Sequence, residues 1–386
     1  MQTASEPSEP GNDPALLQQP FRPFFLGAAL VASLGMLVWV LFLHLGLLPP
    51  GSLPPLLWHG HEMLFGFAAA LMAGFLLTAV SNWTGQPTTT PWSLGALALL
   101  WLAARAAFLL TSVVPYTAAA LLDAAFFPCL AFIVARPILR TRNRRNLFLI
   151  PLLSAFALAD VLFHLAVAGL LRVPPLHVLL WVIDLFVVLM LVIGGRVIPF
   201  FTGRRLPQVP LRSRDWLNAA VNGGAALVLL LDVALPGSMA LGIASLVLAL
   251  FAALRLYGWR PWRTLGEPML WILHAGYLWL AVGLLLRGLA LTAGWLPELT
   301  AVHALTVGAL GSLAIGMMTR VALGHTGRPL AAGWPMAAAF LLVTLAAILR
   351  VSGSVSLLSL AGSLWTAAFT IYFVRFLPVH LGPLRG

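Results

Sequence analysis

Long apolar runs recur along this sequence, and short stretches rich in proline, glycine or arginine separate them. About 20 apolar residues are enough for one helix to cross the hydrocarbon core of a bilayer. Because lipid offers no partner for unpaired backbone groups, we expect each run to form a transmembrane helix. The twelve runs cover residues 24–46, 56–80, 92–110, 116–137, 147–171, 175–199, 215–234, 237–257, 268–293, 299–320, 331–350 and 355–377.

The composition supports an all-α integral membrane protein. Hydrophobic residues make up 61% of the 386 residues and charged residues only 9%, which a water-soluble protein does not accommodate. Residues 1–21 are polar and lack the basic start and apolar core of a signal peptide. We therefore expect a disordered cytoplasmic tail over 1–21 and a twelve-helix membrane domain over 22–386.

The arginines predict the orientation in the membrane. If the N-terminal tail is cytoplasmic, 18 of the 22 arginines fall in segments on that side, and only Arg172 and Arg350 fall in outer segments. Arg105 and Arg287 lie within spans. This asymmetry places both termini in the cytoplasm by the positive-inside rule. It also explains the basic charge without a nucleic-acid partner.

An internal repeat relates the second and tenth apolar runs. Residues 61–87 and 303–329 share seven identities in 27 gap-free positions, among them His61 with His303. A shorter copy, residues 196–204, matches 320–328 at five of nine positions. The copies predict three pseudo-symmetric four-helix units. That arrangement, with histidines near the outer ends of two repeat helices, is similar to the catalytic subunit of haem–copper oxidases.

Small residues recur at every fourth position of both repeat helices. Such a stripe allows close approach by a neighbouring helix or by a flat macrocycle, and the pattern leaves both open. The two stripes are Gly66, Ala70 and Gly74, and Gly308, Ser312 and Gly316.

Histidines near the outer face are the main candidates for chemistry, because an intramembrane imidazole needs a partner. His59 and His61 point about 200° apart on a helix, so they serve two cofactors, or one binds and the other caps the helix or contacts water. The repeat and the topology place His61 and His303 at the same depth, which predicts haem b held by this pair. Glu62 would orient an imidazole or relay protons.

The inner side offers a second pair, His274 and His325, which would meet if their helices pack together. The pair is compatible with copper, with a second haem or with a structural polar contact. Arg196 and Arg320, at equivalent repeat positions, fit anchors for haem propionates, although orientation alone accounts for them. A single cysteine, Cys129, excludes disulfides, iron–sulfur clusters and thiolate zinc sites.

Other polar residues in or near the spans carry weaker signals. His164 follows Asp160 by one helical turn, which slightly favours a functional pair, and His44, His177 and His380 indicate no more than hydrogen bonds or interface contacts. The aspartates of the spans would suit proton movement, but their spacing indicates no channel. They are Asp123, Asp160, Asp184 and Asp232.

Five segments resemble the NnrS family of bacterial inner-membrane proteins. They cover residues 22–30, 58–85, 195–204, 274–287 and 303–329, and include WHGHEMLFGF and HALTVGALGSLAIGMMTR. The resemblance implies nitric oxide as ligand, a role in nitrosative stress and denitrification, and both haem and copper as cofactors. It implies that five histidines hold the cofactors: His59, His61, His274, His303 and His325.

The expected function is therefore a haem protein that binds nitric oxide, with reduction by electrons from quinol or a periplasmic donor as an open question. A non-catalytic sensor or scavenger, and a transporter of a small metabolite or metal, are the alternatives. The oxidase likeness does not extend to oxygen reduction, because residues 215–234 contain no histidine pair for a copper centre.

Overall fold

The computed structural model describes residues 14–49, 51, 53–110 and 113–384, and in these residues the chain forms helices and no strand. Short 3-10 turns and two π-helices join or continue the α-helices. The α-helices are α1 (Phe21–Leu45), α2 (Pro55–His61), α3 (Ala69–Thr84), α4 (Pro91–Leu109), α5 (Tyr116–Ala124), α6 (Phe126–Arg140), α7 (Leu149–Val167), α8 (Pro175–Arg205), α9 (Asp215–Ala234), α10 (Met239–Gly258), α11 (Pro268–Ala293), α12 (Glu298–His303), α13 (Gly311–Gly324), α14 (Gly333–Val351) and α15 (Leu358–Leu381).

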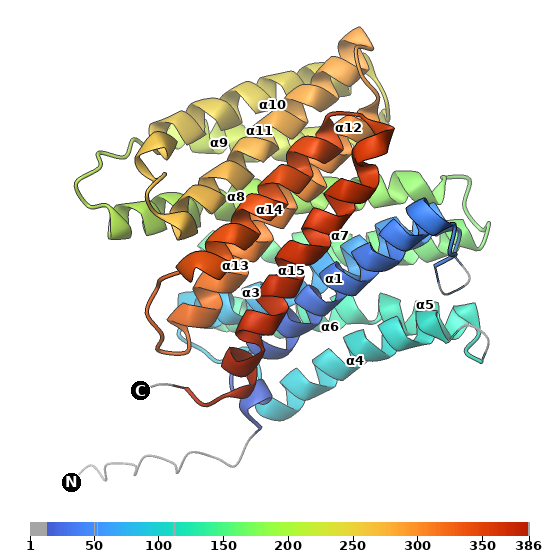
Figure 1. Cartoon of the computed structure of the whole chain (residues 1–386), viewed down its shortest axis with the longest axis horizontal. Coiled ribbons are helices and arrows are strands. Elements are labelled where there is room, and N and C mark those ends of the chain that lie inside the picture. Colours follow the sequence, from blue (N-terminus) through green and yellow to red (C-terminus); the bar gives the residue numbers. More distant parts are fainter. Residues whose placement is uncertain (1–13, 50, 52, 111–112, 385–386) are drawn as a thin grey trace.

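In the part of the chain that the structure describes, twelve helical segments are long and apolar enough to cross a membrane, which confirms the number of spans expected from the sequence. Several extend beyond the apolar runs, for example to Thr84 and Arg205, because backbone hydrogen bonding continues into polar residues. The start of α1 and the end of α15 lie at the same end of the bundle (Figure 1). The Arg22 side chain joins them by donating to the Gly382 carbonyl at 2.9 Å.

One span is interrupted. Its two parts, α5 and α6, meet at Ala125, just before Pro128. A proline cannot donate the backbone hydrogen bond to the residue four positions earlier, here Ala124 at the end of α5. The missing hydrogen bond weakens the helix at this point, where the span is divided.

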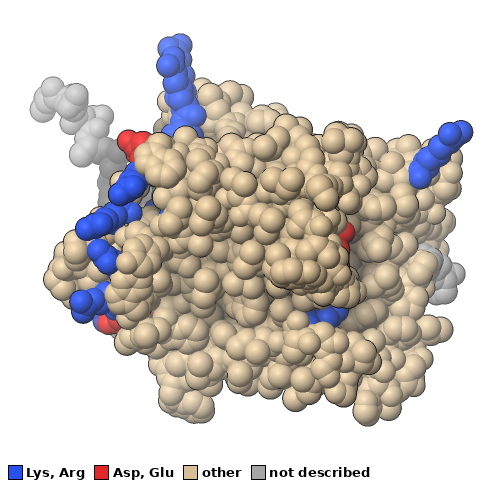
Figure 2. Space-filling model, turned by 90° about the horizontal axis from the view of Figure 1, so that it is seen from above, with Lys and Arg blue, Asp and Glu red and all other residues tan. Residues whose placement is uncertain are grey.

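The surface between the two ends of the bundle is apolar. Side chains such as Leu99, Phe132 and Val374 are about two-thirds exposed. Figure 2 shows arginines gathered toward one end and a broad uncharged surface beside them. An apolar belt of this kind suits contact with lipid, so the chain is a multi-pass membrane protein.

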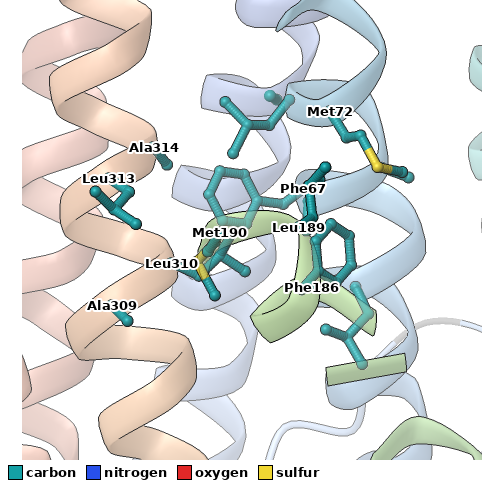
Figure 3. Packing of buried hydrophobic residues seen from close by; sticks show 14 of the residues in the cluster. Phe67, Met72, Phe186, Leu189, Met190, Ala309, Leu310, Leu313 and Ala314 are labelled. Atoms are coloured by element: carbon teal, nitrogen blue, oxygen red, sulfur yellow. The ribbon is translucent and has the colours of Figure 1, made fainter. Parts of the chain in front are cut away.

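The centre of the bundle is formed by the three spans that carry the repeat. These spans are Pro55–Thr84, Pro175–Arg205 and Glu298–Gly324. In an 18-residue apolar stretch of each, 89%, 72% and 83% of the residues are buried. Figure 3 shows Phe67, Phe186 and Leu310 among the side chains that pack where they meet. Close to their ends, Thr84, Thr202 and Thr326 each donate to the carbonyl four residues earlier.

The glycine stripes pack against neighbouring helices. A Cβ added at Gly74 would lie 2.8 Å from Phe25 of α1, and one at Gly308 would lie 2.5 Å from Trp279 of α11. Such distances leave no room for a side chain. The structure therefore favours helix contact over contact with a macrocycle.

The expected tail over residues 1–21 is only partly described. Residues 1–13 lie outside the described residues. Ala15–Leu17 form a 3-10 turn, and the Ala15 carbonyl accepts a hydrogen bond from Arg22 at 2.6 Å. The folded part therefore begins before residue 22.

Candidate functional site

A cavity of about 460 Å³ lies where α1, α2, α8, α12, α14 and α15 meet, at the end of the bundle opposite the termini. Its volume falls in the usual range for small-molecule sites, about 300–1,000 Å³. Aliphatic and aromatic side chains form most of the wall. The polar residues that line it are His59, His177, Glu298, His303, Thr306 and Arg350.

His303 reaches the cavity with one ring nitrogen already engaged. Its Nδ1 lies 2.7 Å from the Leu299 carbonyl, and a carbonyl only accepts, so Nδ1 carries the proton. The neutral ring then has a lone pair on Nε2. A histidine anchored through its other nitrogen to a backbone carbonyl is typical of metal and haem ligands.

His59 lines the cavity without such an anchor. Its ring stacks on Trp39 with centroids 4.3 Å apart and planes 13° from parallel. Its Nδ1 is buried and has no hydrogen-bond partner among the described residues. Because buried polar atoms normally have partners, the unpaired nitrogen makes His59 a candidate for binding a ligand.

A π-helix follows each repeat histidine. The two are η2 (Glu62–Ala68), directly after His61, and η5 (Ala304–Leu310), directly after His303. Their bounds coincide in the gap-free repeat alignment. Because π-turns inside α-helices are rare and frequently mark functional sites, their presence in both copies indicates that this end of the bundle carries the function.

His61 does not line this cavity. Its Nδ1 lies 3.1 Å from Oε1 of Glu62 and its Nε2 lies 2.7 Å from Oδ2 of Asp123. Arg105 of α4 donates to Glu62 at 2.8 Å and also to Asp123. The expected pairing of His61 with His303 is therefore replaced: His59 shares the cavity with His303, because residues two apart leave a helix in nearly opposite directions.

The cluster around His61 extends to α7. Nε2 of His164 lies 3.2 Å from Asp160 and 3.4 Å from Asp123, and its Nδ1 lies 2.9 Å from the Tyr116 hydroxyl. We call His61, Glu62, Arg105, Tyr116, Asp123, Asp160 and His164 the polar cluster. The sequence indicated two parts of it, Glu62 as the partner of a neighbouring imidazole and the one-turn spacing between Asp160 and His164.

Comparison with known protein families gives one match. The profile of one family, described as NnrS protein, matches residues 15–383. The chain belongs to the NnrS family. No match was found among curated proteins.

His274 and His325, which the sequence of this NnrS-family chain predicted as a pair, contact different residues in the structure. His274 is buried, with Nδ1 donating to the Leu270 carbonyl at 3.0 Å and Nε2 3.5 Å from the Thr202 hydroxyl. His325 is exposed, and its ring packs 6.0 Å from Phe21. These contacts favour the structural interpretation of His274 and give His325 no shared site with it.

The arginine near the cavity is not one that the repeat indicated. Arg196 donates to Asn146 at 3.0 Å, and Arg320 lies 3.9 Å from the Phe201 ring centroid, both toward the C-terminal ends of their helices. Arg350, which the sequence indicated only as an outer-segment residue, lines the cavity of this NnrS-family chain instead. It is the cation placed to meet an anionic group there.

A second buried charge cluster adjoins the cavity. Arg287 donates to both oxygens of Asp184, at 2.7 and 2.9 Å, and lies 2.9 Å from Asp232 and 3.2 Å from Glu298. Glu298 is also on the cavity wall. Arg105 and Arg287, the two arginines that the sequence placed within spans, are therefore both held by carboxylates, as intramembrane charges usually are.

Proposed function

We propose that this protein binds haem b in the cavity, with His59 and His303 as the iron ligands, and that it binds nitric oxide there to protect the cell from nitrosative stress. The observation that carries the proposal is the pair of imidazoles on one apolar cavity, one of them with an orphaned buried nitrogen. Nitric oxide itself comes from membership of the NnrS family.

The residues present fit the group. His303 offers Nε2 while the Leu299 carbonyl fixes its ring, and the apolar walls suit a porphyrin face. Arg350 is available for a propionate, since guanidinium and carboxylate form strong paired hydrogen bonds. Haem iron supplies a coordination position for a diatomic ligand. His59, held by stacking on Trp39 alone, is the ligand we expect to yield more readily.

The proposed setting is the bacterial inner membrane with both termini cytoplasmic and the cavity toward the periplasm. The arginine distribution and the common end of the bundle for both described termini support this orientation. The central position of the three repeat spans supports a pseudo-threefold arrangement of four-helix units.

An absorption spectrum tests the haem. We expect a Soret band and a reduced α-band in the purified protein, and loss of the α-band in His303→Ala, whose change removes the anchored ligand. His177→Ala, which alters a histidine at the same cavity, is the matched control and should keep the spectrum. A colourless preparation, or an unchanged spectrum in both His59→Ala and His303→Ala, would contradict the proposal and favour a transporter.

Turnover is decided with the same preparation. Steady consumption of nitric oxide with an added quinol or other reductant would make the protein a reductase, whereas stoichiometric binding would make it a sensor or scavenger.

Copper, which the resemblance also implies, belongs to the proposal as a second metal at the same end of the bundle. Met36 and Met63 bring thioether sulfurs to the cavity wall, and thioether with imidazole suits cuprous ion. Metal content per chain tests it.

A further inference from the structure

We propose that the polar cluster is a second, separate site, which binds one divalent transition-metal ion through His61, Asp123, Asp160 and His164. One ligand atom from each of these side chains lies within 4.8 Å of the others. The inference does not rest on haem in the cavity, because no residue of the polar cluster lines that cavity.

The two imidazoles are oriented as metal ligands usually are. Their Nε2 atoms converge on the carboxylates: His61 lies 2.7 Å from Asp123, and His164 lies 3.2 Å from Asp160. Their Nδ1 atoms point to outer partners, Glu62 for His61 and the Tyr116 hydroxyl for His164. Such outer hydrogen bonds fix the ring and direct the inner nitrogen toward the carboxylates. A metal ion between them would replace the present contact of His61 Nε2 with Asp123.

Asp160 supplies the independent sign of a missing ligand. Its side chain is 1% exposed, and neither carboxylate oxygen has a hydrogen-bond partner among the described residues. The short contact with His164 lacks hydrogen-bond geometry. A carboxylate left without donors inside a membrane protein is costly, and a cation between Asp160 and the two imidazoles would satisfy it.

The charge of the cluster fits a divalent ion. Glu62, Asp123 and Asp160 are opposed by one guanidinium, that of Arg105. With both imidazoles neutral, two negative charges are left uncompensated. The rings of Phe65, Phe108 and Phe163 lie 4.8–5.1 Å from the His61 ring and exclude water on that side. One divalent ion would neutralise the cluster, and protonation of both imidazoles is the competing way to do so.

The donor set selects the class of ion. Two imidazole nitrogens and two carboxylate oxygens suit zinc, ferrous or manganous ions, and soft thiolate ligands are absent from the cluster. A tetrahedral ion with bonds of about 2.0–2.2 Å needs ligand atoms closer together than 4.8 Å. The side chains would therefore close around the ion. Arg105 holds Asp123 and Glu62 from outside, as a positioning residue.

Metal binding by the tag-free, full-length protein in detergent tests the site. After chelation, the protein is titrated with Zn²⁺ and, for its visible bands, with Co²⁺. We expect one ion per chain in the wild type and at least tenfold weaker binding in Asp160→Asn. Asp232→Asn, which changes a buried aspartate of the Arg287 cluster, is the matched control and should bind as the wild type does.

Equal binding by wild type and Asp160→Asn, or no binding by the wild type, would overturn the proposal in favour of protonated imidazoles. If Asp160→Asn does not fold, X-ray absorption on the zinc-loaded wild type decides. A shell of nitrogen and oxygen with two imidazoles is the expected result, and sulfur or any other number of imidazoles overturns it. The haem spectrum, recorded on each sample, shows separately whether the cavity proposal holds.

Discussion

Arg287→Met tests how far the second charge cluster stabilises the bundle. The substitution keeps a long side chain but removes the guanidinium that, among the described residues, pairs with both Asp184 and Asp232, whose side chains are 2% and 3% exposed. Removing one partner of a buried ion pair costs about 3–5 kcal/mol, since it leaves an uncompensated charge in a poorly solvating environment. We expect a loss of that size in the free energy of unfolding.

Equilibrium unfolding in mixed micelles, followed by the fluorescence of the 14 tryptophans, measures this loss. Arg205→Met is the control, because its ion pair with Glu267 is exposed and should contribute nothing measurable. Adding Asp184→Asn to Arg287→Met should restore part of the stability. A change below about 1 kcal/mol in Arg287→Met would refute the reasoning, because the carboxylates would then be accommodated without their cation.

Two further predictions concern packing and the chain ends. Gly308→Ala places a Cβ 2.5 Å from Trp279, so we expect the free energy of unfolding to fall by about 1–3 kcal/mol in the same assay. Gly223→Ala is the control: its Cβ would have nothing within 4 Å, so the change should be neutral or slightly stabilising. Equal effects of the two substitutions would contradict the close-contact argument. Arg22→Gln removes hydrogen bonds to the His380 and Gly382 carbonyls, and amide exchange should rise at the end of α15; unchanged exchange would show that this contact does not hold the C-terminal end.

The number of spans could be predicted from the sequence because a bilayer demands a fixed length of apolar helix. The ends of the spans could not be predicted, since helices such as Pro175–Arg205 continue through polar residues beyond the apolar run. The division between α5 and α6 is a local break within an apolar run, and span lengths alone do not resolve it.

The site could be predicted as a group of histidines but not as a geometry. The sequence shows that His59 and His61 point in opposite directions, but the rotation of α2 among its neighbours decides which one faces the cavity. His61 and His303 are equivalent in the repeat, yet Glu62 and Asp123 of α5 supply carboxylates to His61, while His303 meets a backbone carbonyl. Equivalence along the chain therefore does not carry over to the partners.

The two π-helices mark where the repeat spans can lose a residue. A π-turn bonds residue i to i+5, so it holds one residue more than the α-turn it replaces. Deleting a single residue within η2 or η5 would let the wide turns close to regular α-turns, and the helix on either side would keep nearly the same facing. The histidine before the segment would then stay aligned with the core packing of α3 or α13. A deletion in the α-helical part of the same span would instead rotate its two sides by about 100° relative to each other.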